Sequence, residues 1–167
     1  MLISEEYRKL NEDRHRMGSF GVYGAESINH VMNLCKFFIT QDVLDYGCGQ
    51  SILAKNMPFM IHQYDPAIPL YAREPKPADI VVCTDVLEHI EPECLEDVLA
   101  HLQSLTKKGI FFIVATVPAL KHMPDGTNCH KIIEPYTWWI EKLTKRWMMI
   151  RFEMMKNGFI YVGGLNG

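Results

Sequence analysis

A glycine-rich turn that follows a short apolar segment carries the clearest chemical signal in the sequence. Residues 43–51 read VLDYGCGQS, so an apolar run leads through Asp45 into Gly47 and Gly49. Glycines at such a turn let a ligand approach the backbone without meeting a Cβ atom. The amides at the start of a following helix can hold an anionic group such as a carboxylate. A second acid, Asp65, ends the next apolar segment, where it can bind both hydroxyls of a ribose.

Two classes of cofactor fit a strand, a glycine turn, a helix, a second strand and an acid. A dinucleotide site requires G-x-G-x-x-G, but here Ile52 stands where the third glycine belongs. A nicotinamide oxidoreductase is therefore the disfavoured hypothesis. S-Adenosylmethionine (SAM) needs no pyrophosphate pocket, and its methionine part can occupy the room beside the glycine turn.

Three segments in order resemble the motifs of class I SAM-dependent methyltransferases, in particular the small stand-alone enzymes of bacteria and their phages. VLDYGCGQS is similar to the first motif, YDPAIP to the acidic segment after the second strand, and ADIVVCTDVLEHIEP to the fourth-strand motif. The chain departs from the family in two places. Ser51 stands at the usual third glycine, and residues 66–78 are too short and proline-rich for a full helix and a further strand.

The resemblance implies SAM as cofactor, S-adenosylhomocysteine (SAH) as product, and three groups of cofactor-binding residues. The methionine and ribose side would be lined by Asp45, Gly47, Cys48 and Gly49. The ribose hydroxyls would be bound by Asp65, with Pro66 and Ala67 near the adenine. The wall near the adenine and the sulfur would comprise Thr84, Asp85, Val86 and Leu87. The alternative hypothesis for each of these residues is a purely structural role. Asp45 would cap the end of a strand, Asp65 would be a turn acid before a proline, and residues 85–89 would be the acidic start of a helix.

Histidine is the natural candidate for a catalytic base, which methyl transfer needs only when the acceptor loses a proton. His130 is the best candidate, because the loop 118–131 follows a predicted strand and so lies at the end of the sheet that faces the acceptor. The alternative is a loop histidine that hydrogen-bonds the backbone. His89 and His122 are weaker candidates. We expect no metal site, because His89, Glu91 and His101 lack a recognised ligand spacing.

The acceptor is expected to be a small molecule. The segment Asp85-Val86-Leu87-Glu88 lacks the Asp/Asn-Pro-Pro-aromatic motif that exocyclic-amine DNA methyltransferases share, and no Pro-Cys dipeptide offers the cytosine-C5 nucleophile. We therefore expect O- or N-methylation of a hydroxyl, carboxyl or amine, and no nucleic-acid partner. The alternative is a catalytically silent SAM-binding partner subunit or sensor. Tyr23, in the glycine-rich segment 18–24, and Trp138 are the candidate substrate contacts, although core packing is the default for such tryptophans.

The elements that must position these residues alternate along the chain. Apolar stripes at helical spacing predict helices near 28–39, from 91–93 to about 109, and over 135–146. Short apolar runs predict strands at 43–46, 59–64, 80–84 and 110–117. Asn157-Gly158 separates two further runs and predicts a closing hairpin. Alternation implies parallel strands joined by crossover helices, so we expect an α/β, Rossmann-like class I methyltransferase fold. Its mostly parallel sheet would end in a C-terminal antiparallel hairpin strand.

The whole chain has the composition of an ordinary globular protein. Its 167 residues are 48% hydrophobic and 22% charged, with a net charge of −3, which excludes a disordered or collagen-like chain. The longest uncharged apolar run, 109–120, is shorter than the roughly 20 residues that span a bilayer, and the N-terminus does not read as a signal peptide. Five scattered cysteines without a CxxC pair indicate reduced thiols. We expect a cytoplasmic protein without a membrane partner, with a homodimer left open.

The expected organisation is one domain with an N-terminal extension. Residues 1–25 are polar and then glycine-rich and aromatic, which suggests a lid over the cofactor or else a simple N-terminal arm. Residues 26–167 would form a single SAM-binding methyltransferase domain.

Overall fold

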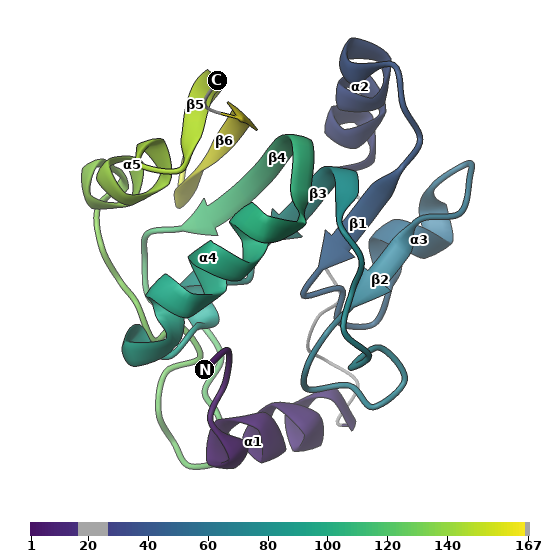
Figure 1. Cartoon of the computed structure of the whole chain (residues 1–167). Coiled ribbons are helices and arrows are strands. Elements are labelled where there is room, and N and C mark those ends of the chain that lie inside the picture. The colour runs from purple at the N-terminus through teal and green to yellow at the C-terminus, as the bar shows by residue number, and fades with distance from the viewer. Residues whose placement is uncertain (17–26, 166–167) are drawn as a thin grey trace.

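A six-stranded sheet with helices on both faces forms the body of the protein in a computed structural model that describes residues 1–16 and 27–165 (Figure 1). The strands are β1 (Val43–Tyr46), β2 (His62–Tyr64), β3 (Ala78–Thr84), β4 (Thr106–Ala115), β5 (Trp147–Met155) and β6 (Gly158–Leu165). The α-helices are α1 (Glu5–Arg16), α2 (Ile28–Phe38), α3 (Ile52–Asn56), α4 (Leu95–Leu105) and α5 (Tyr136–Thr144). Two short 3-10 helices, η2 (Leu87–His89) and η3 (Pro92–Cys94), lie between β3 and α4.

The strand order confirms the predicted mixed topology. The strands lie in the order β2-β1-β3-β4-β6-β5, with β2, β1, β3 and β4 parallel to one another, β6 antiparallel to β4, and β5 antiparallel to β6. Gly158 starts β6 at the predicted hairpin turn, and a Cβ atom there would collide with the carbonyl oxygen of Val114. The hairpin glycine therefore lets β6 come close enough to pair with β4. This is the expected α/β, Rossmann-like arrangement.

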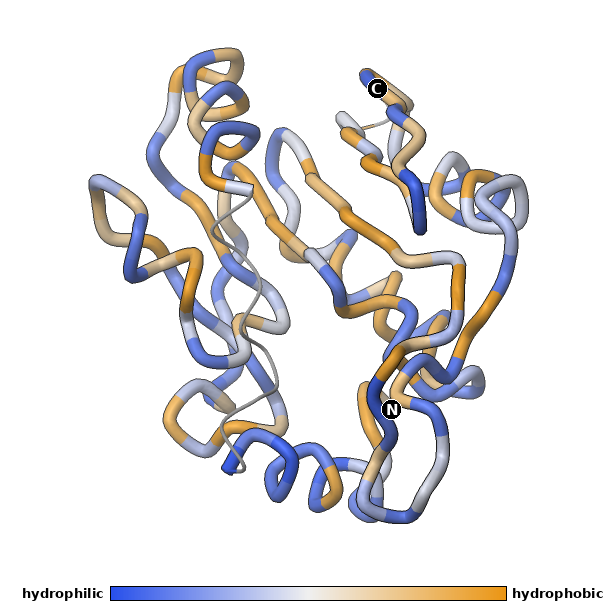
Figure 2. The backbone as a smooth tube through the Cα atoms, turned by 180° about the vertical axis from the view of Figure 1, so that it is seen from behind, coloured by the Kyte–Doolittle hydropathy of each residue, from blue (hydrophilic) through white to orange (hydrophobic). Residues whose placement is uncertain are grey.

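Each face of the sheet is buried by two helices. The stripe of α4, together with Trp139 and Leu143 of α5, packs on one face. Val31 and Cys35 of α2 and Leu53 of α3 pack on the other. Because both faces are covered, the central strands are apolar on both sides, and β3 and β4 appear as hydrophobic segments in Figure 2.

The boundary between α4 and β4 differs from the sequence prediction. Lys107, Lys108 and Gly109 resemble a basic last helical turn with a glycine stop, but α4 ends at Leu105 and β4 already begins at Thr106. The backbone is extended here because β4 pairs with β3 from Thr106 onward, opposite Ala78. Lys107 and Lys108 then form ion pairs with Asp42 at 3.2 Å and Asp79 at 2.8 Å. Tertiary pairing with β3 thus overrides the local helix-end pattern.

The connection from β2 to β3 is as short as the sequence indicates. Residues 65–77, all of which the structure describes, contain neither a helix nor a strand. β2 is the edge strand of the sheet in the residues that the structure describes. This end of the sheet is simpler than a fold with a full crossover helix at that position.

The N-terminal helix α1 crosses the sheet at the carboxyl ends of the parallel strands (Figure 1). It is mainly hydrophilic (Figure 2), but Tyr7 is buried against Met123 and Cys129. The Tyr7 hydroxyl donates to the carbonyl oxygen of His89 at 2.8 Å, and Ser4 donates from both its amide and its hydroxyl to the Glu91 carboxylate. These contacts fix α1 over the strand ends. The proposed lid residues 18–24, Tyr23 among them, lie outside the described residues.

Candidate active site

A cavity of about 440 Å³ lies where β1, β3 and β4 end and α1 crosses above them. This is the edge at which open α/β sheets bind ligands, and the volume is ordinary for a small-molecule site. The sequence-predicted residues that line it are Asp45, Gly47, Cys48, Gly49, Asp65, Pro66, Ala67, Thr84, Asp85, Val86 and His130. The structure therefore brings residues from four separate segments to one cavity.

The glycine turn after β1 has the backbone shape that its sequence implies. The amides of Gly47 and Cys48 both donate to the carbonyl oxygen of Tyr64, which ties the turn to the end of β2. Gly47 and Gly49 have φ values of 76° and 50°, in the left-handed region that favours glycine. Ser51 also lies there, with φ 63°. Ser51 thus has the left-handed backbone conformation that a glycine at this position would adopt more easily.

Asp65 is held rigidly at the end of β2. Its Oδ2 accepts the Gly49 amide at 3.0 Å and its Oδ1 accepts the Ala67 amide at 2.9 Å. The residue is only 7% exposed, and burial raises the pKa of its carboxyl, against the opposing effects of His15 and the two amides. The two amides orient the carboxylate and leave its remaining lone pairs for a ligand.

Asp45 places a second carboxyl beside the same cavity. It is 4% exposed, and burial, followed by repulsion from Asp65, raises the pKa of Asp45 to about 7. Burial also raises the pKa of the neighbouring Cys48 thiol. Two buried acids in one cavity favour a ligand that carries positive charge and hydroxyl groups.

The end of β3 forms the opposite wall. Thr84, Asp85 and Val86 line the cavity, and Asp85 has a left-handed φ of 54°. Leu87 does not line it. Its side chain is fully buried among the α4-side core residues, because the η2 turn directs it inward. The expectation that Leu87 belongs to the cofactor wall is therefore not met.

His130 reaches the cavity from the loop after β4. Its Nδ1 lies 2.6 Å from the carbonyl oxygen of Val117, and its ring packs edge-on against the ring of His89 with 4.8 Å between centroids. Because a carbonyl oxygen only accepts, Nδ1 carries the hydrogen, and the lone pair of the neutral ring is on Nε2. The backbone hydrogen bond that the sequence offered as an alternative to catalysis therefore exists, and it orients the ring.

Sequence reasoning gave Glu88 no role of its own and treated His89 only as a weaker candidate for the base. Glu88 is fully buried, and burial, followed by repulsion from Asp85, raises the pKa of its carboxyl to about 8. Burial lowers the pKa of His89 to about 4, and His89 Nδ1 lies 2.8 Å from the carbonyl oxygen of Cys129. No spacing motif could have joined these two residues to His130, because a whole helix and strand separate them in the sequence.

The N-terminal helix also contributes to the cavity, through Tyr7, Asn11 and His15. Their sequence context is polar and gave no signal for a ligand.

Trp138 does not line the cavity. It stands on α5, where it packs against the core edge and against Trp139, and the Lys142 ammonium lies 4.6 Å from its ring centroid. Since α5 covers the face of the sheet rather than its carboxyl edge, the expected role of Trp138 as an acceptor wall is not met. Its neighbour Trp139 is fully buried in the core.

Gly47 offers a test of how tightly the turn is built. Replacing Gly47 with alanine should destabilise the protein by at least about 1 kcal/mol more than Gly126→Ala. Both positions have positive φ and so share the backbone strain, but only a Cβ at Gly47 collides with Val86, whereas a Cβ at Gly126 meets nothing. Chemical denaturation of both variants measures the difference. Equal losses of stability would show that Val86 moves away without cost.

The fold and the site define the protein as a SAM-dependent methyltransferase. The family model described as "Methyltransferase domain" matches residues 5–160. The chain therefore belongs to this methyltransferase family, as the motif resemblance indicates. A comparison with curated protein sequences gave no match.

Solved structures with the same fold are distant in sequence. DhpI in complex with SAH is 16% identical, with 96% of each chain covered and a TM-score of 0.62. Magnesium protoporphyrin IX methyltransferase from Synechocystis PCC 6803 with bound SAH is 15% identical over 85% of this chain and 83% of that chain, with a TM-score of 0.59. The 1,6-didemethyltoxoflavin-N1-methyltransferase of Burkholderia thailandensis is 11% identical over 100% and 92%, with a TM-score of 0.66. At these identities the likeness establishes the fold.

In the parts of the chain that the structure describes, no helix combines the length and the apolarity needed to cross a membrane.

Proposed function

We propose that the protein transfers the methyl group of SAM to an oxygen or nitrogen atom of a small-molecule acceptor. One observation carries the proposal: a single cavity collects the glycine turn, the rigid carboxylate of Asp65 and the ring of His130. These three groups would face, in turn, the anionic end of the cofactor, its ribose, and the acceptor beside its reactive methyl group.

The cofactor would bind through the turn and the two acids. The glycines at 47 and 49 admit the methionine part close to the backbone, and Asp65, preset by two amides, accepts hydrogen bonds from the ribose hydroxyls. Pro66 and Ala67 would adjoin the adenine. The ionised form of Asp45 would offset the positive charge of the ammonium or sulfonium.

The transfer itself is an in-line displacement, so the protein contributes chiefly positioning and the exclusion of water. The bond between sulfur and the methyl carbon breaks as the acceptor atom forms its bond to that carbon, and SAH leaves as a neutral sulfide. An acceptor hydroxyl or amine must also lose a proton. His130 would accept that proton on Nε2, because Nδ1 is fixed by the Val117 carbonyl.

A small acceptor agrees with the enclosure of the site. Helix α1 is held over the cavity by the hydrogen bonds of Tyr7 and Ser4. The cavity volume of about 440 Å³ must accommodate both the cofactor and the acceptor. Two of the structural relatives are named for small acceptors, 1,6-didemethyltoxoflavin and magnesium protoporphyrin IX. The portion of the 1–25 segment that the structure describes would thus act as a wall of the site.

Calorimetric titration of the purified protein with SAM, SAH and NAD is the first test. We expect micromolar binding of SAM and SAH and no binding of NAD. A screen of hydroxylated, carboxylated and amino metabolites for SAH formation follows. Binding without any turnover in a broad screen would favour the alternative of a silent SAM-binding subunit or sensor, and absence of binding would contradict the proposal.

SAM affinity should rise about tenfold between pH 6 and pH 7.5. Below its pKa of about 7, Asp45 is protonated and cannot offset the cofactor's positive charge, so binding must release a proton. The groups that face Asp45 are Asp65, Cys48 and Cys83. Burial raises the pKa of both thiols, which stay neutral in this range, while Asp65 would reinforce the trend. Asp45→Asn should flatten the profile, and calorimetry at four pH values measures both proteins. A profile of equal slope in the variant would exclude Asp45 as its source.

A further inference from the structure

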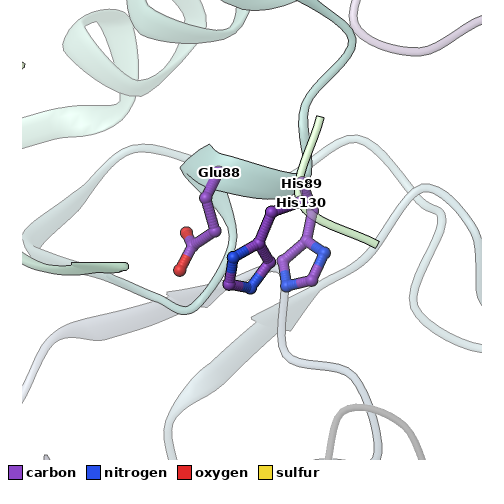
Figure 3. A group of neighbouring side chains, drawn as sticks. All are labelled: Glu88, His89 and His130. Atoms are coloured by element: carbon purple, nitrogen blue, oxygen red, sulfur yellow. The ribbon is translucent and has the colours of Figure 1, made fainter. Parts of the chain in front are cut away.

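We propose that Glu88, His89 and His130 form a binding site for a divalent transition-metal ion at the acceptor side of the cavity. One ligand atom from each residue lies within 4.8 Å of those of the other two. Figure 3 shows the carboxylate of Glu88 beside the two rings. His89 and His130 both line the cavity, so an ion held there would be accessible to a bound acceptor. The part of this proposal that concerns catalysis rests on the proposed methyl transfer, whereas ion binding does not.

Both histidine rings are already oriented as metal ligands. His130 Nδ1 lies 2.6 Å from the Val117 carbonyl oxygen, and His89 Nδ1 lies 2.8 Å from that of Cys129. Metal-bound histidines almost always donate their other ring N–H to such a partner, which fixes the tautomer and the ring plane. Each ring thereby presents Nε2 as its coordinating atom.

Glu88 would supply the anionic ligand. One of its carboxylate oxygens also lies in an environment that is otherwise unexplained. Its Oε1 accepts the Ala115 amide at 2.8 Å, but its Oε2 is buried and has no hydrogen-bond partner among the described residues. A buried carboxylate oxygen without a partner is costly. Coordination of an ion would satisfy that oxygen, which belongs to a side chain that is 0% exposed.

The backbone joins the two halves of the site. The Glu88 carbonyl oxygen accepts the amides of Lys131 and Ile132 at 2.7 and 3.0 Å. These bonds hold the loop that carries His130 against the η2 turn that carries Glu88 and His89. The three ligands are therefore brought together by the fold before any ion binds.

The ligand set selects the type of ion. Two imidazoles and one carboxylate suit zinc, iron, cobalt or nickel, whereas magnesium and calcium prefer oxygen ligands throughout. Three protein ligands leave coordination positions for an acceptor oxygen. Coordination would lower the pKa of an acceptor hydroxyl, which would release its proton to solvent before the methyl carbon is transferred. The ion would change neither its charge nor its oxidation state.

His130 cannot bind a metal ion and act as a base at the same time, because both functions use the lone pair on Nε2. In the metal-loaded enzyme the ion would replace His130 as the group that prepares the acceptor. In the metal-free enzyme the base role described above stands.

Titration of the chelator-treated full-length protein with Co²⁺, followed by visible absorption and calorimetry, tests the site. We expect one Co²⁺ per chain with ligand-field bands, and an affinity at least about tenfold weaker in both His130→Ala and Glu88→Gln. His122→Ala is the matched control, since His122 is exposed in the same loop and should leave binding unchanged. Competition with Zn²⁺ should abolish the bands.

Parallel titration with SAM separates the two proposals. SAM binding with no Co²⁺ bands, or with Co²⁺ binding that survives His130→Ala, would overturn the metal site and leave the methyltransferase proposal intact. Co²⁺ binding without SAM binding would do the reverse. Circular dichroism shows whether each variant is folded, and if Glu88→Gln is not, His130→Ala decides the result.

Discussion

Asp65→Ala should weaken SAM and SAH binding by about 100-fold or more. A hydrogen bond to a charged group contributes about 1.5–3 kcal/mol, Asp65 would accept two from the ribose hydroxyls, and each 1.4 kcal/mol corresponds to a factor of ten. The effect should be large because two amides already fix the carboxylate in position, so binding does not have to order it. Calorimetry or a competition assay with labelled SAH measures the change.

A merely structural role for Asp65 would also weaken binding, because its two amide contacts support the turn. A thermodynamic cycle separates the roles. SAH and its 2′-deoxy analogue are titrated against the parent and against Asp65→Ala. If Asp65 binds the ribose, loss of the 2′-hydroxyl should cost the parent about tenfold and the variant almost nothing. An equal cost in both proteins would show that Asp65 acts only through the turn.

The parts of the site that lie in continuous sequence could be predicted. The turn after β1 needs glycines for its positive φ values, and the acid after β2 precedes a proline, so both are visible as local patterns. The carboxyl ends of parallel strands meet at one edge, which is enough to bring Asp45, Asp65 and Asp85 to one cavity. Alternating apolar runs likewise predicted the sheet, because the runs that form its central strands β1, β3 and β4 are largely buried.

The parts that depend on tertiary contacts could not be predicted. Periodicity gives a helix but not the direction of each residue relative to a cavity, so Trp138 was assigned to the site although it packs against the core. Leu87 was assigned through the motif resemblance, which does not show that its side chain turns into the core. Adjacent residues on a helix point about 100° apart, and only the packing of α5 decides which of Trp138 and Trp139 turns inward. Likewise, Glu88 and His89 become neighbours of His130 only through the backbone bonds from Lys131 and Ile132.

His130→Ala should lower kcat by about 10²–10⁴-fold on an acceptor that must lose a proton, while the Kd for SAM changes less than about twofold. The ring is preset by the Val117 carbonyl, whereas the cofactor contacts come from the turn after β1 and from Asp65. His122→Ala should retain parental turnover. Stopped assays of SAH formation at saturating SAM, together with calorimetry, give both constants. Equal turnover in the parent and His130→Ala would remove His130 from the reaction.

Chelation distinguishes the two ways in which His130 could act. If it accepts the proton directly, the chelator-treated parent remains active, and His130→Ala lowers that activity to the same extent as before treatment. If His130 acts as a metal ligand, chelation alone should reduce the parent nearly to the level of the variant, and Zn²⁺ or Co²⁺ should restore the parent but not the variant. Glu88→Gln should then follow His130→Ala, because both remove a ligand of the same ion. Under direct base catalysis, Glu88→Gln should keep most of the parent's turnover, since Glu88 is fully buried and does not line the cavity.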